Sequence, residues 1–509
     1  MVCRDKAGKT MMPLFREEGE SMKVLFLPVD SRPCNRLFPK QILEWCGATC
    51  IEPPPDIFDH FTQPSNWEGI KQFLIEHAEE ADVWAISMDQ LCYGSLLSSR
   101  SAVVTEEEVK ERLAWFEAFR NQYPEKPVHV INTILRTSIS TLKTSDLQVY
   151  HAMTEYSYWS DKASITGSME DMARSEQAAR RIPTDVILQY HSVRQRNHML
   201  NARCVELTKR GIFSSLLLLM EDSEEYGFHR AEQRVLVEKI ADDPRITIKN
   251  GTDEGPLLAM KCLMPQPISL SIQWIGRVDG KFIARYEDRP FEENVARALA
   301  YLGIENDPES KTVLAIAANE EGVQVDMVIT EYATTPSYPK EAKQAADRIN
   351  ELLQSGYDVY LLDQFCCNGG WPEFTRQIDH PEKLSGYSAW NTASNALATL
   401  LGQLCSDTIA GKKNLRFRNE RFLDDLLYES CIRSQLNHML RAYGQDPYHL
   451  SDPEDAERQL REMFEDLFSQ RGGWTKRFAN IVHVIKETGP YRVSLPWERT
   501  FEVEAHQDD

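Results

Sequence analysis

The chain has 509 residues, of which 42% are hydrophobic and 27% are charged, and its formal net charge is -21 at pH 7. This is the composition of a folded protein, not of a disordered one, and the length allows two or three domains. The negative charge disfavours nucleic acid and anionic membrane surfaces as partners.

The alternation of predicted strands and helices begins at Met22, after an N-terminal extension. Residues 1–21 lack the apolar middle of a signal peptide, and we expect them to be disordered. In residues 22–265, near-continuous apolar runs alternate with amphipathic stretches, which predicts a parallel sheet with helices on both faces. A barrel-like (β/α) domain and an open doubly wound sheet both fit this pattern. The expected strands are 23–29, 48–53, 82–88, 127–135, 213–220 and 245–250, and the expected helices include 66–79, 105–121 and 230–241.

The remainder of the chain predicts a second, smaller α/β domain and a helical C-terminal region. Within the first domain, the mostly helical stretch 137–201 is too long for an ordinary crossover, and we expect it to form a lid or wall over one sheet edge. Residues 401–509 are expected to be mainly helical. In the second domain, residues 266–400, the expected strands are 269–274, 282–288, 313–318, 325–332 and 358–365, with a helix at 292–302.

The eleven cysteines show no repeated spacing and no CxxC pair. A disulfide framework or a zinc knuckle is therefore not expected, and a reducing cytoplasm is the compartment that fits best. Cys34 could act as a nucleophile, but a small buried thiol is the more common role. No apolar run approaches the roughly 20 residues that a membrane-spanning helix needs.

Polar residues that directly follow the apolar runs are the candidate site residues, because ligands of parallel α/β sheets bind beyond the carboxyl ends of the strands. The candidates for catalysis are Glu221, Asp222 and Asp89. The candidates for substrate binding are Asp30, Arg32, Tyr93, Arg100, Asn132, Arg136, Asn250 and Asp253 in the first domain, and Asp363, Asn368, Trp390, Asn391 and Asn395 beyond it.

Glu221 and Asp222 form the most distinctive pair, since they follow a run of five apolar residues. Two adjacent acids repel each other, which raises the pKa of at least one and supplies an acid and a base at neutral pH. Successive residues of a strand point in opposite directions. Both acids can therefore face one site only if the strand breaks there, and Ser223 and Gly227 favour such a break.

Structural roles compete with function at several of the other candidates. Asp30 could cap the following turn or pair with Arg32, and Asp89 could form a buried ion pair with Arg100. For Asp253 and the neighbouring Glu254, helix capping is the favoured interpretation.

The phrase GYSAWNTASNALATLLGQ, residues 386–403, places amides and a hydroxyl near the start of a predicted helix. Asn391, Thr392 and Asn395 would present these groups, and Trp390 could stack on the apolar face of a sugar ring. The alternative is an N-capped helix with a core tryptophan, because Asn and Thr are good caps by themselves.

Together these phrases resemble the uncharacterised bacterial domain-of-unknown-function 4127 family. The matching phrases are PVDSRPCN, MDQLCYGSLLSSR, NTILRTS, EDSEEYG, NGTDEG and GYSAWNTASN, which span Met22 to about Arg433. Where that family usually has two aspartates, this chain has Glu221 and Asp222. Glutamate keeps the negative charge of aspartate but has a longer side chain. Where it usually has two glycines, this chain has Gly94 and Ser95. The resemblance supports the map of the site and implies no reaction.

A glycoside hydrolase acting on a small, N-acetylated or plain sugar is the preferred function, because acids, amides and tryptophans occur without a nucleotide-binding loop or a nucleophile elbow. Adjacent acids at a strand end look like those of retaining hexosaminidases, in which the acetamido group of the substrate takes part. Asp222 would then be the general acid and Glu221 its polarising partner, while Asp89 and Asn391 hold sugar hydroxyls.

Two other functions fit the same residues. A divalent-metal-dependent isomerase or hydrolase would use Asp30, Asp89, Asp222 and His229 as ligands, although no HExxH or HxH cluster occurs. A non-catalytic carbohydrate-binding protein would instead have its acids paired with arginines. The expected partner is a small carbohydrate, with no organic cofactor, and homo-oligomer formation is left open.

Overall fold

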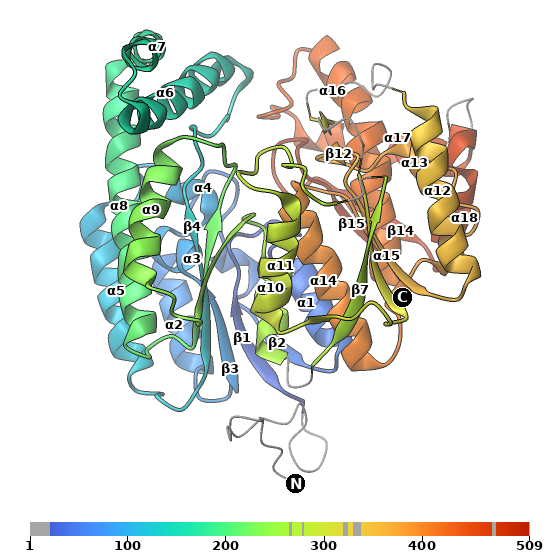
Figure 1. Ribbon diagram of the computed structural model, residues 1–509, viewed down its shortest axis with the longest axis horizontal. Helices are drawn as coiled ribbons and strands as arrows, with labels where there is room; N and C mark the ends of the chain where they lie inside the picture. Colours follow the sequence, from blue (N-terminus) through green and yellow to red (C-terminus); the bar gives the residue numbers. More distant parts are fainter. Residues whose placement is uncertain are drawn as a thin grey trace. The chain divides into compact units, whose positions relative to one another are not determined.

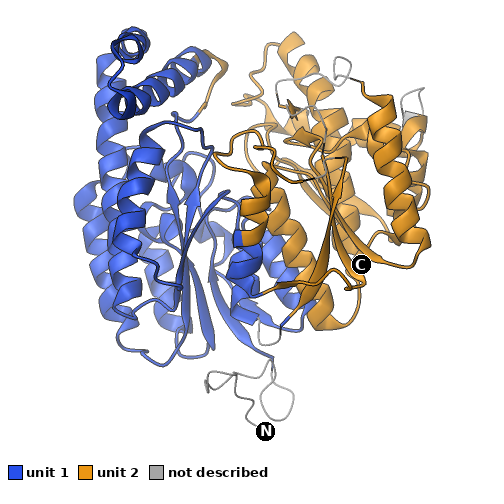
Figure 2. Ribbon diagram, in the orientation of Figure 1, with its two compact units in different colours: residues 1–140, 146–267, 297–303 blue, residues 141–145, 268–296, 304–509 orange. Residues whose placement is uncertain are grey.

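The computed structural model describes residues 21–263, 267–276, 279–318, 324–328, 337–470 and 475–507. The chain forms two compact units, which Figure 2 shows in different colours. Unit 1 comprises Met1–Ser140, Asp146–Pro267 and Arg297–Gly303, and unit 2 comprises Thr141–Ser145, Ile268–Ala296 and Ile304–Asp509. The predicted disordered extension lies outside the described residues except for Ser21, and so does the predicted domain boundary at 265–266.

Unit 1 is built on an open sheet of six parallel strands in the order β2-β1-β3-β4-β5-β6. Every strand predicted in this part of the chain is present. The sheet ends at β2 on one side and at β6 on the other, so the doubly wound alternative is correct and the barrel is not. The strands are β1 (Lys23–Leu27), β2 (Thr49–Ile51), β3 (Val83–Ser87), β4 (Val128–Ile134), β5 (Ser215–Met220) and β6 (Ile246–Asn250).

Helices cover both faces of this sheet, as the apolar strands require (Figure 1). Because side chains alternate along a strand, Trp84, Leu216 and Ile248 share one core with the helices of one face. That face carries α2 (Trp67–His77), α5 (Glu106–Arg120), α8 (Thr184–Lys209) and α9 (Phe228–Ile240), and the other carries α1 (Leu37–Trp45) and α10 (Gly255–Leu263). The short helices α3 (Met88–Tyr93) and α4 (Leu96–Ser99) follow β3.

Local sequence signals fix the starts of two predicted helices. The Thr105 side chain accepts a hydrogen bond from the Glu108 backbone while the Glu108 side chain accepts one from Thr105, so a complete capping box begins α5. Asn66 accepts a hydrogen bond from the Gly69 backbone and begins α2. Both helices lie within the ranges that the sequence predicts.

The predicted helical stretch 137–201 is confirmed as three helices. The helices α6 (Leu147–Thr166) and α7 (Met169–Ala179) form a hairpin, and α8 follows them. In Figure 1 the hairpin lies on the side of unit 1 to which the carboxyl ends of the strands point. This is the placement that a wall or lid over that edge requires.

Unit 2 repeats the strand order of unit 1. Its parallel sheet has the order β13-β11-β9-β7-β8, so its first strand lies between its second and third, as β1 lies between β2 and β3. The strands are β7 (Ser269–Ile275), β8 (Glu305–Asn306), β9 (Thr312–Ala317), β11 (Asp358–Asp363) and β13 (Gly386–Ser388). Two short strands, β10 (Val325–Asp326) and β12 (Cys366–Cys367), pair separately.

The two faces of the unit 2 sheet have different partners. Val359 and Leu361 belong to a large core shared with α12 and the C-terminal helices. Tyr360, on the opposite face, donates to Asp407 of α14 at 2.9 Å. The helices of this region are α11 (Phe291–Leu302, divided between the units), α12 (Pro339–Gln354), α13 (Pro372–Thr375), α14 (Ala393–Ala410), α15 (Leu415–Arg421), a π-helix (Phe422–Ile432), α16 (Arg433–Ala442), α17 (Pro453–Phe468) and α18 (Ala479–Glu487).

The strands of unit 2 differ from the sequence-based prediction in three places. The predicted strand 282–288 is wrong, because the backbone turns at Tyr286, whose φ is 66°. Of the predicted strand 325–332, only Val325–Asp326 is a strand, and residues 329–332 lie outside the described residues. The helical C-terminal region is confirmed, but it also contains an antiparallel pair that the sequence did not reveal, β14 (Tyr491–Ser494) and β15 (Glu504–Gln507).

Among the described residues, no helix combines the length and the apolar character that crossing a membrane requires.

Candidate active site

The carboxyl ends of β1 and β3 in unit 1 define the point where the strand order reverses. The chain runs from β1 outwards to β2 and then returns to β3 on the other side of β1. In open α/β sheets, ligands bind in the crevice outside the carboxyl ends of the strands at such a switch point. Asp30 and Arg32 follow β1, and Asp89 follows β3, so three predicted site residues lie there.

Arg32 is the centre of a buried polar network beyond β1. Its Nη2 donates to Asp30 at 2.8 Å and to Asp253 at 2.6 Å, although Asp253 is more than 200 residues away in the sequence. Asn35 donates to the same two carboxylates at 2.9 and 2.8 Å. The ion pair of Asp30 with Arg32 that the sequence offered as a structural alternative is therefore present, and Asp253 shares it.

Glu221 and Asp222 both contact Arg136. The backbone N–H of Arg136 donates to Glu221 at 3.2 Å, and its guanidinium forms an ion pair with Asp222, with Nη2 2.8 Å from a carboxylate oxygen. Glu221 also accepts a hydrogen bond from Arg100. The φ of Asp222 is 28°, in the left-handed region, so the extended backbone breaks directly after Glu221. This break brings two successive acids to the same arginine, which a regular strand could not do.

Exposure distinguishes the two acids. The side chain of Glu221 is 2% exposed, whereas that of Asp222 is 25% exposed. Arg100 and Arg136 lie between these extremes, at 13% and 16%. Solvent therefore reaches this cluster from the side of Asp222.

Asp89 differs from the arginine-bound acids of the site because no arginine of the described residues forms an ion pair with it. Its Oδ2 accepts hydrogen bonds from the backbone N–H and the hydroxyl of Thr133, at 2.9 and 2.7 Å. Its Oδ1 is buried and has no hydrogen-bond partner among the described residues. The pKa of Asp89 is raised to about 7, mainly by burial and also by nearby Glu221, while the hydrogen bonds from Thr133 and the charge of Arg100 act in the opposite direction. The predicted ion pair between Asp89 and Arg100 is not formed, since Arg100 binds Glu221.

The other predicted site residues of unit 1 have neighbours within the protein. Asn132 donates to Asn201 at 2.7 Å, and the Tyr93 ring lies 4.5 Å from the guanidinium of Arg196. The carbonyl of Asn250 accepts a hydrogen bond from Lys249 at 2.6 Å. Lys249 also forms a fully buried ion pair with Glu254 at 2.6 Å, and helix capping by Glu254 stays a prediction.

Three buried polar residues of α8 hold the loops of this site, and the sequence analysis did not single them out. Arg194 donates to the carbonyl of Arg136 at 2.7 Å, and Asn197 donates to that of Ser99 at 3.0 Å. Asn201 donates to the backbone of β4 at 3.1 Å. Residues 194, 197 and 201 lie on one helix face, which is buried and should be apolar in an ordinary core helix. Polar residues on a helix face that is expected to be apolar were the sequence feature that could have identified these three residues.

A buried acid beyond β1 was also missed. Asp59 accepts a hydrogen bond from Ser31 at 3.2 Å, and burial, assisted by the nearby Asp30, raises the pKa of Asp59 well above its usual value. Asp59 lies in an irregular segment after β2, where no apolar run marked it as a strand end.

Helix α6 fixes the loop that carries Glu221 and Asp222. Asp161 accepts a hydrogen bond from the Gly227 backbone at 3.0 Å and pairs with Arg234. Ser157 accepts one from the Phe228 backbone at 3.0 Å. Because no side chain of its own caps α9, these two residues of α6 satisfy N–H groups at its start. The helical hairpin is thereby tied to the site loop.

Replacing Asp161 by alanine should loosen this loop. The lost charge-assisted hydrogen bond is worth roughly 1.5–3 kcal/mol, so the Gly227 amide should exchange its hydrogen about 10- to 100-fold faster. Hydrogen–deuterium exchange of the intact protein measures this change. Glu155→Gln is the matched control, because it removes an exposed ion pair with Arg181 from the same helix. Equal exchange rates at residues 223–228 in both variants would contradict the assignment.

The predicted residues beyond the first domain lie in unit 2. Asp363 accepts hydrogen bonds from the Trp371 backbone at 2.8 Å and from the Tyr387 hydroxyl at 3.1 Å, so it organises the loop after β11. Burial raises the pKa of Asp363 to about 6, although these hydrogen bonds lower it. The Asn391 carbonyl accepts a hydrogen bond from the Asn368 backbone at 2.7 Å.

The helix α14 begins after Thr392, one of the predicted capping residues, but the predicted capping hydrogen bond of its side chain is not formed. Instead, Glu287 accepts a hydrogen bond from the Ser394 backbone at 2.7 Å. Trp390 and Asn395 are buried, at 5% and 3% exposure. The combination of Asp89 with Asn391 on one ligand stays a prediction, since the two residues belong to different units.

The described residues contain no group of three or more His, Cys, Asp and Glu side chains placed to hold a metal ion. His229, offered as a ligand, lies with its Nε2 3.0 Å from the Glu224 backbone nitrogen. Cys34 is buried, as is usual for a small thiol in a core. The metal-dependent alternative therefore has no ligand cluster in this part of the chain.

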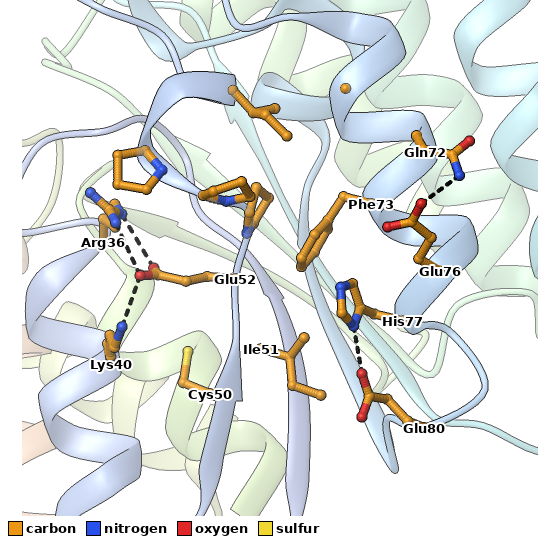
Figure 3. Close-up of a pocket in the computed structure, with 15 residues that line it drawn as sticks. Arg36, Lys40, Cys50, Ile51, Glu52, Gln72, Phe73, Glu76, His77 and Glu80 are labelled. Carbon is orange, nitrogen blue, oxygen red and sulfur yellow. Dashed lines mark hydrogen bonds and ion pairs between the residues drawn. The ribbon is translucent and has the colours of Figure 1, made fainter.

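A groove of about 770 Å³ lies at the open edge of unit 1, beside β2 (Figure 3). Its charged groups have partners within the lining: Arg36 and Lys40 bind Glu52, His77 binds Glu80, and Glu76 accepts a hydrogen bond from Gln72. Three successive prolines, 53–55, follow the short edge strand, a combination that blocks pairing with another strand. None of the predicted site residues lines this groove.

Residues 24–506 of the chain match the family described as "Protein of unknown function (DUF4127)". The chain belongs to this family. The match confirms the resemblance seen in the strand-end phrases and extends it through the C-terminal region. No curated protein and no solved structure matches the chain significantly. Membership of the DUF4127 family brings no established activity.

Proposed function

We propose that this DUF4127 protein is an acid–base enzyme, a hydrolase of glycosides of small sugars, with Asp89 as the group that transfers the proton. The observation that carries this proposal is a buried carboxyl group with one unbound oxygen at the switch point of the unit 1 sheet. Burial raises the pKa of Asp89 to about 7, so a large fraction of the group is protonated at neutral pH. General acids work best when their pKa lies near the working pH.

The surrounding charges favour a neutral substrate. Glu221 and Asp222 offset the charges of Arg100 and Arg136, to which they are bound. With Asp89 protonated, the cluster has no excess positive charge to attract a phosphate or a carboxylate. The Nε–H groups of Arg100 and Arg136 have no hydrogen-bond partner among the described residues, and they can donate to hydroxyl or acetamido oxygens.

This proposal reassigns the roles of the acids. The sequence suggested Asp222 as general acid, but Asp222 is bound to Arg136 and is better suited to orienting that arginine and the substrate. Asp89 would give its proton to the leaving glycosidic oxygen as the bond to the anomeric carbon breaks. Water would then add to the anomeric carbon and return a proton to the Asp89 carboxylate, which completes the hydrolysis.

A panel of nitrophenyl glycosides tests the reaction: the β-glucoside, the β-galactoside and the N-acetyl-β-glucosaminide. The purified protein should release nitrophenol from at least one of them. Asp222→Asn should raise KM about tenfold, the worth of one charge-assisted hydrogen bond, with a smaller change in kcat. A folded Asp222→Asn protein with unchanged KM and kcat would remove Asp222 from the site.

A non-catalytic carbohydrate-binding protein is the second candidate, because most acids of the site are bound to arginines. Asp30 and Asp253 share Arg32, Glu221 binds Arg100, and Asp222 binds Arg136. Acids held in this way can orient a ligand without transferring protons. Binding of a sugar that is recovered chemically unchanged after long incubation would favour this candidate over the hydrolase.

A further inference from the structure

Unit 2 also contains a cluster of polar residues, centred on Asp326. The carboxylate of Asp326 is buried, and it accepts a hydrogen bond from the Tyr286 hydroxyl at 2.6 Å. Its other oxygen accepts hydrogen bonds from the Asn368 side chain and from the Val328 backbone, both at 2.9 Å. Asp326 ends the short strand β10, whereas Tyr286 and Asn368 lie in two separate loops, so the cluster joins segments that are distant in the sequence.

Two members of this cluster have an unusual backbone. The φ angles of Tyr286 and Asn368 are 66° and 59°, in the left-handed region that residues with a Cβ rarely adopt. The side chains of both residues donate hydrogen bonds to the Asp326 carboxylate, which fixes their positions. Residues in this conformation cluster at binding and active sites, where the surrounding structure enforces it.

One buried polar atom of this cluster, and one in the loop that adjoins it, make no hydrogen bond within the part of the chain that the structure describes. The side-chain oxygen of Asn368 and the indole nitrogen of Trp390 have no hydrogen-bond partner among the described residues, although both side chains are polar and buried. The two loops that carry them meet, because the Asn368 backbone donates to the carbonyl of Asn391, the neighbour of Trp390. Buried polar atoms normally have partners, so each unused one requires an explanation.

We propose that unit 2 contains a second small-molecule site at Tyr286, Asp326, Asn368 and Trp390, which binds a neutral, polyhydroxylated ligand. The unused groups are one acceptor and one donor, both uncharged, and a hydroxyl group satisfies either of them. Asp326 is the acid of the cluster, and the Arg285 guanidinium lies 3.8 Å from it, which balances the charge. The same strand order places a switch point in unit 2 between β7 and β9, where ligands of such sheets bind.

Fluorine NMR of the full chain, labelled with 5-fluorotryptophan, tests this site. The Trp390 resonance is assigned by its loss in Trp390→Phe. The probes are D-glucose, D-galactose and N-acetyl-D-glucosamine, and at least one of them should shift the Trp390 resonance in a saturable manner. If none of the three sugars shifts it, the proposal is wrong.

Two variants show whether the shift reports the proposed contacts. Asn368→Gly removes the amide but retains a residue that accepts a left-handed backbone, so the fold should persist and the affinity should fall at least about tenfold. Tyr286→Phe removes one hydrogen bond to Asp326 and should weaken binding several-fold. Unchanged affinity in both variants would overturn the proposal.

Asp89→Asn separates this site from the one in unit 1. The Trp390 shift should keep its affinity in that variant, whatever the variant does to glycoside hydrolysis. Loss of the shift in Asp89→Asn would mean that the sugar binds through the unit 1 site, and the second site would be rejected. Hydrolysis can fail in the nitrophenyl assay while this titration succeeds, so the two proposals stand or fall separately.

Discussion

Replacing Asp89 by asparagine is expected to lower kcat for glycoside hydrolysis by roughly 10²–10⁴-fold, the usual contribution of a general acid. The amide oxygen of asparagine can accept the two hydrogen bonds from Thr133, so the surrounding structure should be retained. The amide cannot give up a proton in the way that a carboxylic acid does. The measurement is kcat and KM on the best substrate of the nitrophenyl panel. A folded Asp89→Asn protein within about threefold of the wild-type kcat would exclude Asp89 as the general acid.

The wild-type rate should also depend on pH in a direction set by this group. Burial raises the pKa of Asp89 to about 7, and a general acid acts in its protonated form. The rate should therefore fall as the pH rises through about 7, and Asp89→Asn should lose this limb of the profile. A wild-type rate that is constant from pH 6 to 8 would contradict the assignment.

The same substitution should increase stability at alkaline pH. Between about pH 4 and pH 7 the unfolded chain has lost the Asp89 proton while the folded chain retains it, so this group contributes less stability as the pH rises. Above pH 7 the wild-type protein buries a charged carboxylate, at a cost of roughly 4 kcal/mol relative to its low-pH state. Asp89→Asn has no such charge. Its Tm should exceed that of the wild type at pH 8, and the advantage should be smaller at pH 5.

Asp185→Asn is the control for these comparisons, because Asp185 is an exposed acid on α8. Its effects on rate and on Tm should be small at every pH. A loss of stability at pH 8 in Asp89→Asn would show that the carboxylate is stabilised by partners that outweigh its burial.

Replacing Arg32 by methionine is expected to destabilise unit 1 by about 3–5 kcal/mol. Arg32 donates to Asp30 and to Asp253, which are 0% and 3% exposed. Methionine fills much of the same space but leaves two buried carboxylates facing each other without a cation. The measurement is urea unfolding at pH 7, followed by circular dichroism.

Two further variants show whether the destabilisation comes from the loss of the buried ion pairs. Arg180→Ala removes an exposed ion pair with Glu176 and should change the stability by less than about 0.5 kcal/mol. The triple variant Arg32→Met, Asp30→Asn, Asp253→Asn removes the unpaired charges and should recover part of the lost stability. If the triple variant is no more stable than Arg32→Met, the loss comes from packing and not from charge.

The secondary structure of unit 1 was largely predictable because its signals are local. Runs such as 216–220 are apolar at every position, which is typical of parallel strands covered on both faces. The prediction failed at 282–288, whose composition suits a strand but whose backbone turns at Tyr286. The reason is tertiary: the Tyr286 hydroxyl binds Asp326, which lies in strand β10. Similarly, β13 has only three residues and forms through pairing with β11.

Sequence alone determined which acids lie at the carboxyl ends of the strands, since a parallel sheet delivers all of those ends to one edge. It could not determine their partners. Arg32 binds an acid two residues away and another 221 residues away, and Arg100 binds Glu221 and not Asp89. Strand order and loop packing decide those distances, and they also decide burial. The distinction between an arginine-bound carboxylate and Asp89, which Thr133 binds through one oxygen, is therefore a property of the tertiary structure, because Coulomb interactions and desolvation depend on neighbours in space and not along the chain.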